Sequence, residues 1–111
     1  MVQIGREDKD GACVLRPQGD LTNDFVPIFK AQREALVSEG QANVVVSLAG
    51  IGLLSSIGIR ELMACYKDCS GAGGQLIICE MTEQVEDILD TTGLLGVFTV
   101  AKTVDEALGL F

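Results

Sequence analysis

Three consecutive valines at positions 44–46 lie at the centre of an uncharged run from Asn43 to Leu48. A strand without alternating polar residues is typical of a sheet that is buried on both faces. The apolar run from Gln75 to Cys79 has the same character. Because helices must cover both faces of such a sheet, these two runs predict an α/β domain with Asn43 to Leu48 in the centre of its sheet.

The remaining segments complete an alternating pattern. Strand-like runs from Val2 to Arg6 and from Ala12 to Pro17 are joined through Asp10-Gly11, which is a strong signal for a β-hairpin. Turn and capping residues at 19–24 precede a helix that we expect to reach about Ser38. The other expected elements are a helix from the double serine to about Cys69, a short helix capped by Thr82, a short strand from Val97 to Val100, and a last helix opened by the capping box at 103–106. The predicted order is β-β-α-β-α-β-α-β-α, with a mixed sheet and about four helices.

The length and the hydropathy of the chain indicate one compact domain, residues 1–111. The chain has 111 residues, of which 48% are hydrophobic, and no linker or low-complexity segment divides it. The uncharged stretch from Gly40 to Ile59 is interrupted by polar residues and glycines, so we do not expect it to insert into a membrane. The first ten residues lack the pattern of a secretory signal. We therefore expect a cytoplasmic protein.

The charged residues and the absence of histidine argue against several classes of function. Sixteen acidic residues against eight basic ones give a net charge of −8, which argues against a nucleic-acid partner. Without histidine there is no Ser-His or Cys-His pair for nucleophilic catalysis. Gly50-x-Gly52 lacks the third glycine of a dinucleotide fingerprint, because that position is Ser55, and no Gly-Lys-Ser/Thr motif is present. We expect neither an enzyme nor a bound cofactor.

Four cysteines, Cys13, Cys65, Cys69 and Cys79, could suggest a metal or redox site. No C-x-x-C spacing and no histidine accompany them, and two of the four lie in apolar strand-like runs. The sequence therefore favours buried, reduced cysteines with a structural role, and we expect no metal site.

The serine pair Ser55-Ser56 stands where a predicted helix begins. We expect a glycine-rich loop, which includes Gly50 and Gly52, to lead from the strand at 43–48 to this pair. One serine can act as the N-cap, with its hydroxyl accepting a hydrogen bond from a free backbone N–H. A phosphate at the same place would meet unpaired N–H groups and the positive end of the helix dipole. The pair is therefore a candidate cap, a candidate phosphorylation site, or both.

Three segments of the chain resemble motifs of one known family. The run from Leu54 to Leu62, after a buried strand, is similar to the signature of STAS domains, which include bacterial anti-sigma factor antagonists and cytoplasmic domains of sulphate transporters. Residues 19–22 resemble the Gly-x-Leu-Asp turn of that family, with Thr22 in place of Asp, and residues 91–94 resemble its Ser-Gly-Leu segment. With the order of the elements, the resemblance covers essentially the whole chain.

The resemblance implies a partner and a possible switch. In the bacterial antagonists, the hydroxyl residue immediately before a glycine is phosphorylated by the cognate anti-sigma factor, which is itself a serine kinase. Aligning that glycine with Gly58 puts Ile57 at the usual acceptor position, and Ile57 has no hydroxyl. Either Ser56 or Ser55 then accepts the phosphate, or the domain is a binding module that is not phosphorylated at this loop.

By the same resemblance, an anti-sigma factor or another protein of its pathway is expected to dock on residues 53–60 and the nearby Thr22. The expected contact residues are Thr22, Leu54, Ser55, Ser56, Ile57, Gly58, Ile59 and Arg60. A different class of function stays open because of Gly50-x-Gly52: sensing of a small molecule or nucleotide, or assembly with other STAS domains. A homodimer also stays open.

Overall fold

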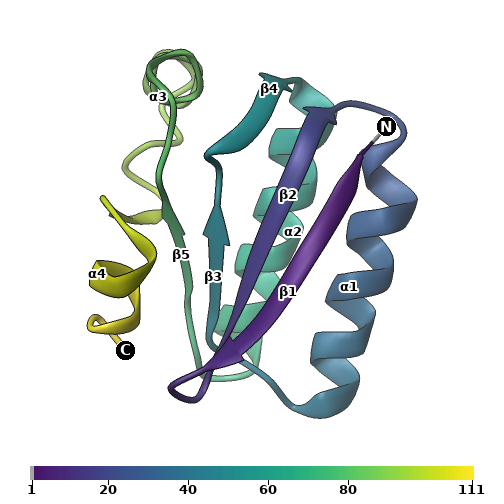
Figure 1. Cartoon of the computed structure of the whole chain (residues 1–111), viewed down its shortest axis with the longest axis vertical. Coiled ribbons are helices and arrows are strands. Elements are labelled where there is room, and N and C mark those ends of the chain that lie inside the picture. Colours follow the sequence, from purple (N-terminus) through teal and green to yellow (C-terminus); the bar gives the residue numbers. More distant parts are fainter. Residues whose placement is uncertain (1) are drawn as a thin grey trace.

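The computed structural model describes residues 2–111, and in this range six strands and four helices form one α/β domain (Figure 1). The strands are β1 (Gln3–Lys9), β2 (Ala12–Leu21), β3 (Val44–Ser47), β4 (Gly50–Leu54), β5 (Leu76–Cys79) and β6 (Thr99–Ala101). The helices are α1 (Phe25–Glu39), α2 (Ser56–Gly71), α3 (Glu83–Thr91) and α4 (Val104–Leu108).

The strands form a mixed sheet in the order β1-β2-β3-β5-β6, and β4 also pairs with β2. The hairpin pair β1–β2 is antiparallel, whereas every other pair is parallel. Parallel neighbours in this sheet are joined through helices, as such connections require. The predicted fold class, an α/β domain with a mixed sheet and four helices, is confirmed.

Strand β4 lies where the sequence predicts a glycine-rich loop, so that expectation is wrong. β2 runs on past Pro17 to Leu21, and its second half offers an edge with which β4 pairs after the chain leaves β3. A Cβ at Gly50 would lie 2.9 Å from Cγ of Gln18. Glycine is therefore required by the close approach of β4 to β2, and here it marks a strand and not a turn.

Two apolar clusters cover the two faces of the sheet. Cys13, Leu15, Val44, Val46 and Ile78 point to the face that carries α1 and α2, whose buried side chains include Phe25, Phe29 and Leu62. The alternate residues Val14, Val45 and Ile77 point to the opposite face, where they pack with Val104 and Ala107 of α4. In Figure 1, α1 and α2 run side by side along the sheet. The sheet is therefore buried on both faces, as the valine-rich run predicts.

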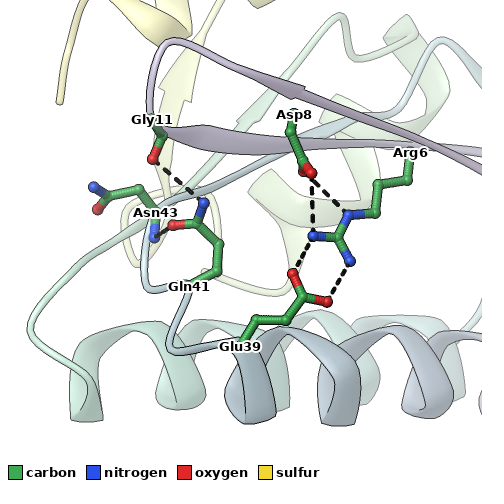
Figure 2. A network of polar contacts seen from close by, with 6 residues as sticks. All are labelled: Arg6, Asp8, Gly11, Glu39, Gln41 and Asn43. Atoms are coloured by element: carbon green, nitrogen blue, oxygen red, sulfur yellow. Dashed lines mark hydrogen bonds and ion pairs between the residues drawn. The ribbon is translucent and has the colours of Figure 1, made fainter.

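The end of the hairpin is tied to the end of α1 by a network of polar contacts (Figure 2). Both terminal nitrogens of Arg6 in β1 donate to the carboxylate of Glu39, with 2.9 Å between Nη1 and Oε2. Arg6 Nε also donates to Asp8 at 3.1 Å. Beyond the helix, the side chain of Gln41 donates to the carbonyl oxygen of Gly11 at 3.3 Å and accepts from the backbone N–H of Asn43. These bonds hold the hairpin against the segment that leads into β3.

The two predicted caps of the shorter helices are present. Thr82 Oγ1 accepts from the backbone N–H of Val85 at 3.3 Å, and Thr103 Oγ1 accepts from that of Glu106 at 3.1 Å.

The four cysteines, Cys13, Cys65, Cys69 and Cys79, are buried and none is in a disulfide. Among residues 2–111 we find no helix that is both long enough and apolar enough to cross a membrane.

Candidate functional site

The N-terminus of α2 is fastened to the end of β2 by Ser55. Its hydroxyl donates to the backbone carbonyl of Leu21 at 2.6 Å and accepts from the backbone N–H of Gly58 at 3.4 Å. Its own backbone N–H also donates to the Leu21 carbonyl, at 3.4 Å. Ser55 is therefore the N-cap of α2 and, at the same time, the tie between two elements that lie far apart in the sequence.

Gly58 allows this close contact because it has no side chain. A Cβ at this position would lie 2.7 Å from Cβ of Leu21 and 2.8 Å from its carbonyl oxygen. Atoms at such distances overlap, so any larger residue would push the first turn of α2 away from β2. The contact also places Thr22, the residue after Leu21, beside the start of α2.

Ser56 differs from Ser55 in its surroundings. It is the first residue of α2 and is exposed, whereas Ser55 is half-buried. Its side chain lies outside the bonds that cap the helix, which Ser55 makes. A hydroxyl that is both exposed and free of the cap is the one that a modifying enzyme could reach without disturbing the fold.

The eight expected contact residues lie together around the start of α2, but they differ in exposure. Arg60 and Ser56 are exposed, Thr22, Ser55, Ile57 and Ile59 are half-buried, and Leu54 and Gly58 are buried. Leu54 belongs to the core cluster under α1 and α2. The surface of this region is thus made by the exposed and half-buried members, while the buried ones position them.

Leu53, the first residue of the expected docking segment 53–60, adds an exposed apolar side chain that is absent from the expected contact residues. It is 42% exposed, whereas the next residue, Leu54, is 3% exposed. Two adjacent leucines in a presumed loop gave no signal of which one faces outward. The pairing of β4 decides this, because its register against β2 shifts between the pairs Gly19–Ile51 and Leu21–Leu54. Ile51 and Leu54 are therefore both buried, and Leu53 between them faces outward.

No feature of the described chain suggests a cofactor at this place. Gly50 and Gly52 lie in β4, and a Cβ on Gly52 would lie 2.8 Å from Oδ1 of Asp20. The glycines are thus explained by strand packing, whereas a phosphate-binding motif needs a turn whose N–H groups converge. Within residues 2–111, no three acidic, cysteine or histidine side chains gather in a way that could hold a metal ion.

Comparisons with known proteins agree on one family. A family model described as "STAS domain" matches residues 3–107. The "Putative anti-sigma factor antagonist BtrV" of Bordetella bronchiseptica is 28% identical over 102 residues, which cover 92% of this chain and 88% of the relative. The "Anti-sigma F factor antagonist" of Paenibacillus polymyxa is 24% identical over 100 residues, which cover 89% and 86%.

A similar fold is found in the crystal structure of an anti-sigma factor antagonist from Mycobacterium paratuberculosis. The TM-score is 0.87 at 23% identity, and the alignment covers 99% of this chain and 93% of the other. The likeness therefore extends over nearly the whole chain, including the sheet and the helix that begins at Ser56.

Proposed function

The chain belongs to the STAS domain family, and we propose that it acts as an anti-sigma factor antagonist whose docking surface surrounds the start of α2. We define the docking surface as Thr22, Leu53, Ser56, Ile57, Ile59 and Arg60. Two relatives that align with most of the chain are named as such antagonists, which supports this class of function. The proposed partner is an anti-sigma factor with a serine-kinase fold.

The proposal rests on one observation: the start of α2 is held firmly against β2, while the side chains around it are accessible. Ser55 and Gly58 fix the helix start to Leu21, as described above. Around this base, Leu53 is 42% exposed and Ser56 is exposed. A surface that is already held in one conformation loses little conformational entropy when a partner binds.

Ser56 is the proposed acceptor if the partner phosphorylates this domain. Its hydroxyl is exposed, while that of Ser55 is occupied by Leu21 and Gly58. A phosphate would add about two negative charges beside Leu53 and Ile57, and these charges would oppose an apolar contact with the partner. Unphosphorylated protein would then bind the anti-sigma factor, and phosphorylated protein would release it.

An affinity capture from the native cell tests the docking surface. The baits are the wild-type chain, Leu53→Asp, and Val37→Asp as a matched control, because Val37 is 59% exposed on α1 and lies outside the docking surface. We expect the wild type and Val37→Asp to retain a protein with an anti-sigma factor or serine-kinase domain, and Leu53→Asp to lose it. Retention by all three baits, or failure to recover such a protein, contradicts the proposal.

The purified partner then tests the switch. With ATP present, we expect phosphate on the wild-type chain and none on Ser56→Ala, as measured by peptide mass spectrometry. Ser56→Asp should weaken binding by about tenfold, because one carboxylate reproduces part of the phosphate charge. Phosphate on Ser56→Ala would move the acceptor elsewhere. If no phosphate is found on the wild type, the domain binds without this switch.

A further inference from the structure

The two edges of the sheet differ in charge. β1, at one edge, carries four consecutive charged residues from Arg6 to Lys9. Charged residues on an edge strand hinder its pairing with another chain. At the other edge, residues 97–101, which include β6, carry no charge. Within the described chain β6 pairs with β5 alone, so the outer side of its backbone lacks a strand partner.

The backbone around β6 is firmly held, while two of its side chains face outward. Phe98 is buried, and its ring packs edge-on against Tyr66 of α2 with 6.0 Å between the ring centroids. Val97 and Val100 are 39% and 37% exposed. The edge therefore offers a short strand with one exposed apolar side chain, Val100, and a second one, Val97, in the turn before it. Another extended segment could cover both.

An open cavity of about 450 Å³ adjoins this edge, at the carboxyl ends of β5 and β6. Its lining includes Val100 and the carboxylate residues Glu80, Glu86 and Glu106, with Lys102 as the one basic residue. Glu80 is held in place, because its carboxylate accepts from the hydroxyl of Ser47 at 2.6 Å and its backbone N–H donates to the carbonyl of Lys102 at 3.2 Å. Three carboxylates against one ammonium group make the cavity suited to a cation.

We propose that the outer edge of β6 binds an extended segment of a partner protein, which sets an apolar side chain on Val100 and a lysine or arginine in the acidic cavity beside it. The main-chain groups of the segment would pair with the free edge, and the charge of the cavity would select the basic residue. This surface shares no residue with the docking surface at the start of α2, so variants can test the two proposals independently.

The charge of the molecule favours a foreign partner over a second copy of the chain. Each copy carries a net charge of −8, so two copies would repel each other at a shared edge. The cavity already contains the chain's own Lys102, and it remains acidic in its presence. A basic segment from another protein would not be repelled, and its positive charge would be attracted by the acidic cavity.

Peptide binding to the full chain tests the proposal. The probes are a fluorescein-labelled peptide Thr-Val-Lys-Val-Thr with blocked ends, and the same peptide with Glu in place of Lys. We expect the lysine peptide to bind with an affinity at least about tenfold higher than the glutamate peptide, as measured by fluorescence anisotropy. We also expect it to shift the NMR signals of amides 97–102. No binding of the lysine peptide at millimolar concentration, or equal binding of both peptides, would overturn the proposal.

Two matched pairs of variants locate the site. Glu83 and Glu86 are both exposed in the first turn of α3, but only Glu86 lines the cavity. We expect Glu86→Lys to weaken binding of the lysine peptide about tenfold and Glu83→Lys less than about twofold. Val100→Lys should also weaken binding, whereas Val37→Lys on α1 should not. Equal effects within either pair would overturn the proposal, as would a dimer of the wild type that Val100→Lys dissociates.

Discussion

The hydroxyl of Ser55 donates to the backbone carbonyl of Leu21 across 34 positions of sequence, with 2.6 Å between the two oxygens. Ser56, the next residue, is exposed and takes no part in the cap. Two adjacent serines of the same chemistry thus have different tasks. Ser55 joins α2 to β2, and Ser56 faces the surface where the proposed partner docks.

Because only Ser55 makes these bonds, its alanine variant should lose more stability than the alanine variant of Ser56. Ser55→Ala removes the bond to Leu21 and the cap on Gly58, and it should lower the free energy of unfolding by about 1–2 kcal/mol. Ser56→Ala should change it by less than about 0.5 kcal/mol, as is usual for an exposed residue. Urea unfolding followed by circular dichroism measures both. Equal costs would mean that Ser55 does not make the tie.

Gly58 and Gly71, at the two ends of α2, form a second matched pair. Gly58→Ala brings a methyl group to within 2.7 Å of Leu21 and should cost about 1–3 kcal/mol in the free energy of unfolding. Gly71→Ala meets no atom within 4 Å and should be neutral or stabilise the chain by up to about 1 kcal/mol, because alanine favours a helix. Urea unfolding of both variants gives the comparison. A Gly58→Ala variant as stable as the wild type would show that the close contact with β2 is not tight.

The central part of the fold could be predicted from the sequence because its signals are local. The valine-rich run, the Asp10-Gly11 turn and the capping threonines each act through neighbours in the sequence, and the structure has β3, the hairpin and both caps at those places. The position of the double serine at a helix start was predictable for the same reason.

β4 could not be predicted, because the feature that creates it is distant in the sequence. Gly50 and Gly52 have low strand propensity, and their pairing depends on the second half of β2, more than thirty positions earlier. The same limit applies to the candidate site. The sequence indicates a serine cap, but only the approach of Leu21 shows which serine is occupied, and only the strand β4 shows that Leu53 faces outward.

The network in Figure 2 predicts that the stability of the fold decreases at acid pH. Hydrogen bonds from Arg6 hold the pKa of Glu39 below its ordinary value of 4.5. A lowered pKa in the folded chain gives stability that is present above the pKa of the unfolded chain and is lost as the pH falls through the pKa of the folded chain. Arg6→Gln should therefore return the pKa of Glu39 toward its ordinary value, as measured by NMR titration. An unchanged titration of Glu39 in this variant would show that the contact is not formed in solution.

The buried cysteines predict a loss of stability at alkaline pH. Burial raises the pKa of Cys13 to about 11 and that of Cys79 to about 12, from an ordinary value of 9.0. Between pH 9 and 11, these thiols ionise in the unfolded chain and stay protonated in the folded one. Each then lowers the free energy of unfolding by up to about 1.4 kcal/mol per pH unit, a loss that is absent below the pKa of the unfolded chain.

Urea unfolding at several pH values between 7 and 10 checks this with Cys79→Ala and the double variant Cys13→Ala/Cys79→Ala. Both variants lose buried volume, so they should be less stable than the wild type at neutral pH. The informative quantity is the slope of stability against pH above pH 9, which should be smaller in Cys79→Ala and smaller again in the double variant. The slope separates the ionisation of the thiols from the loss of packing, because packing does not change with pH. Three equal slopes would mean that the thiols ionise as readily in the folded chain as in the unfolded one.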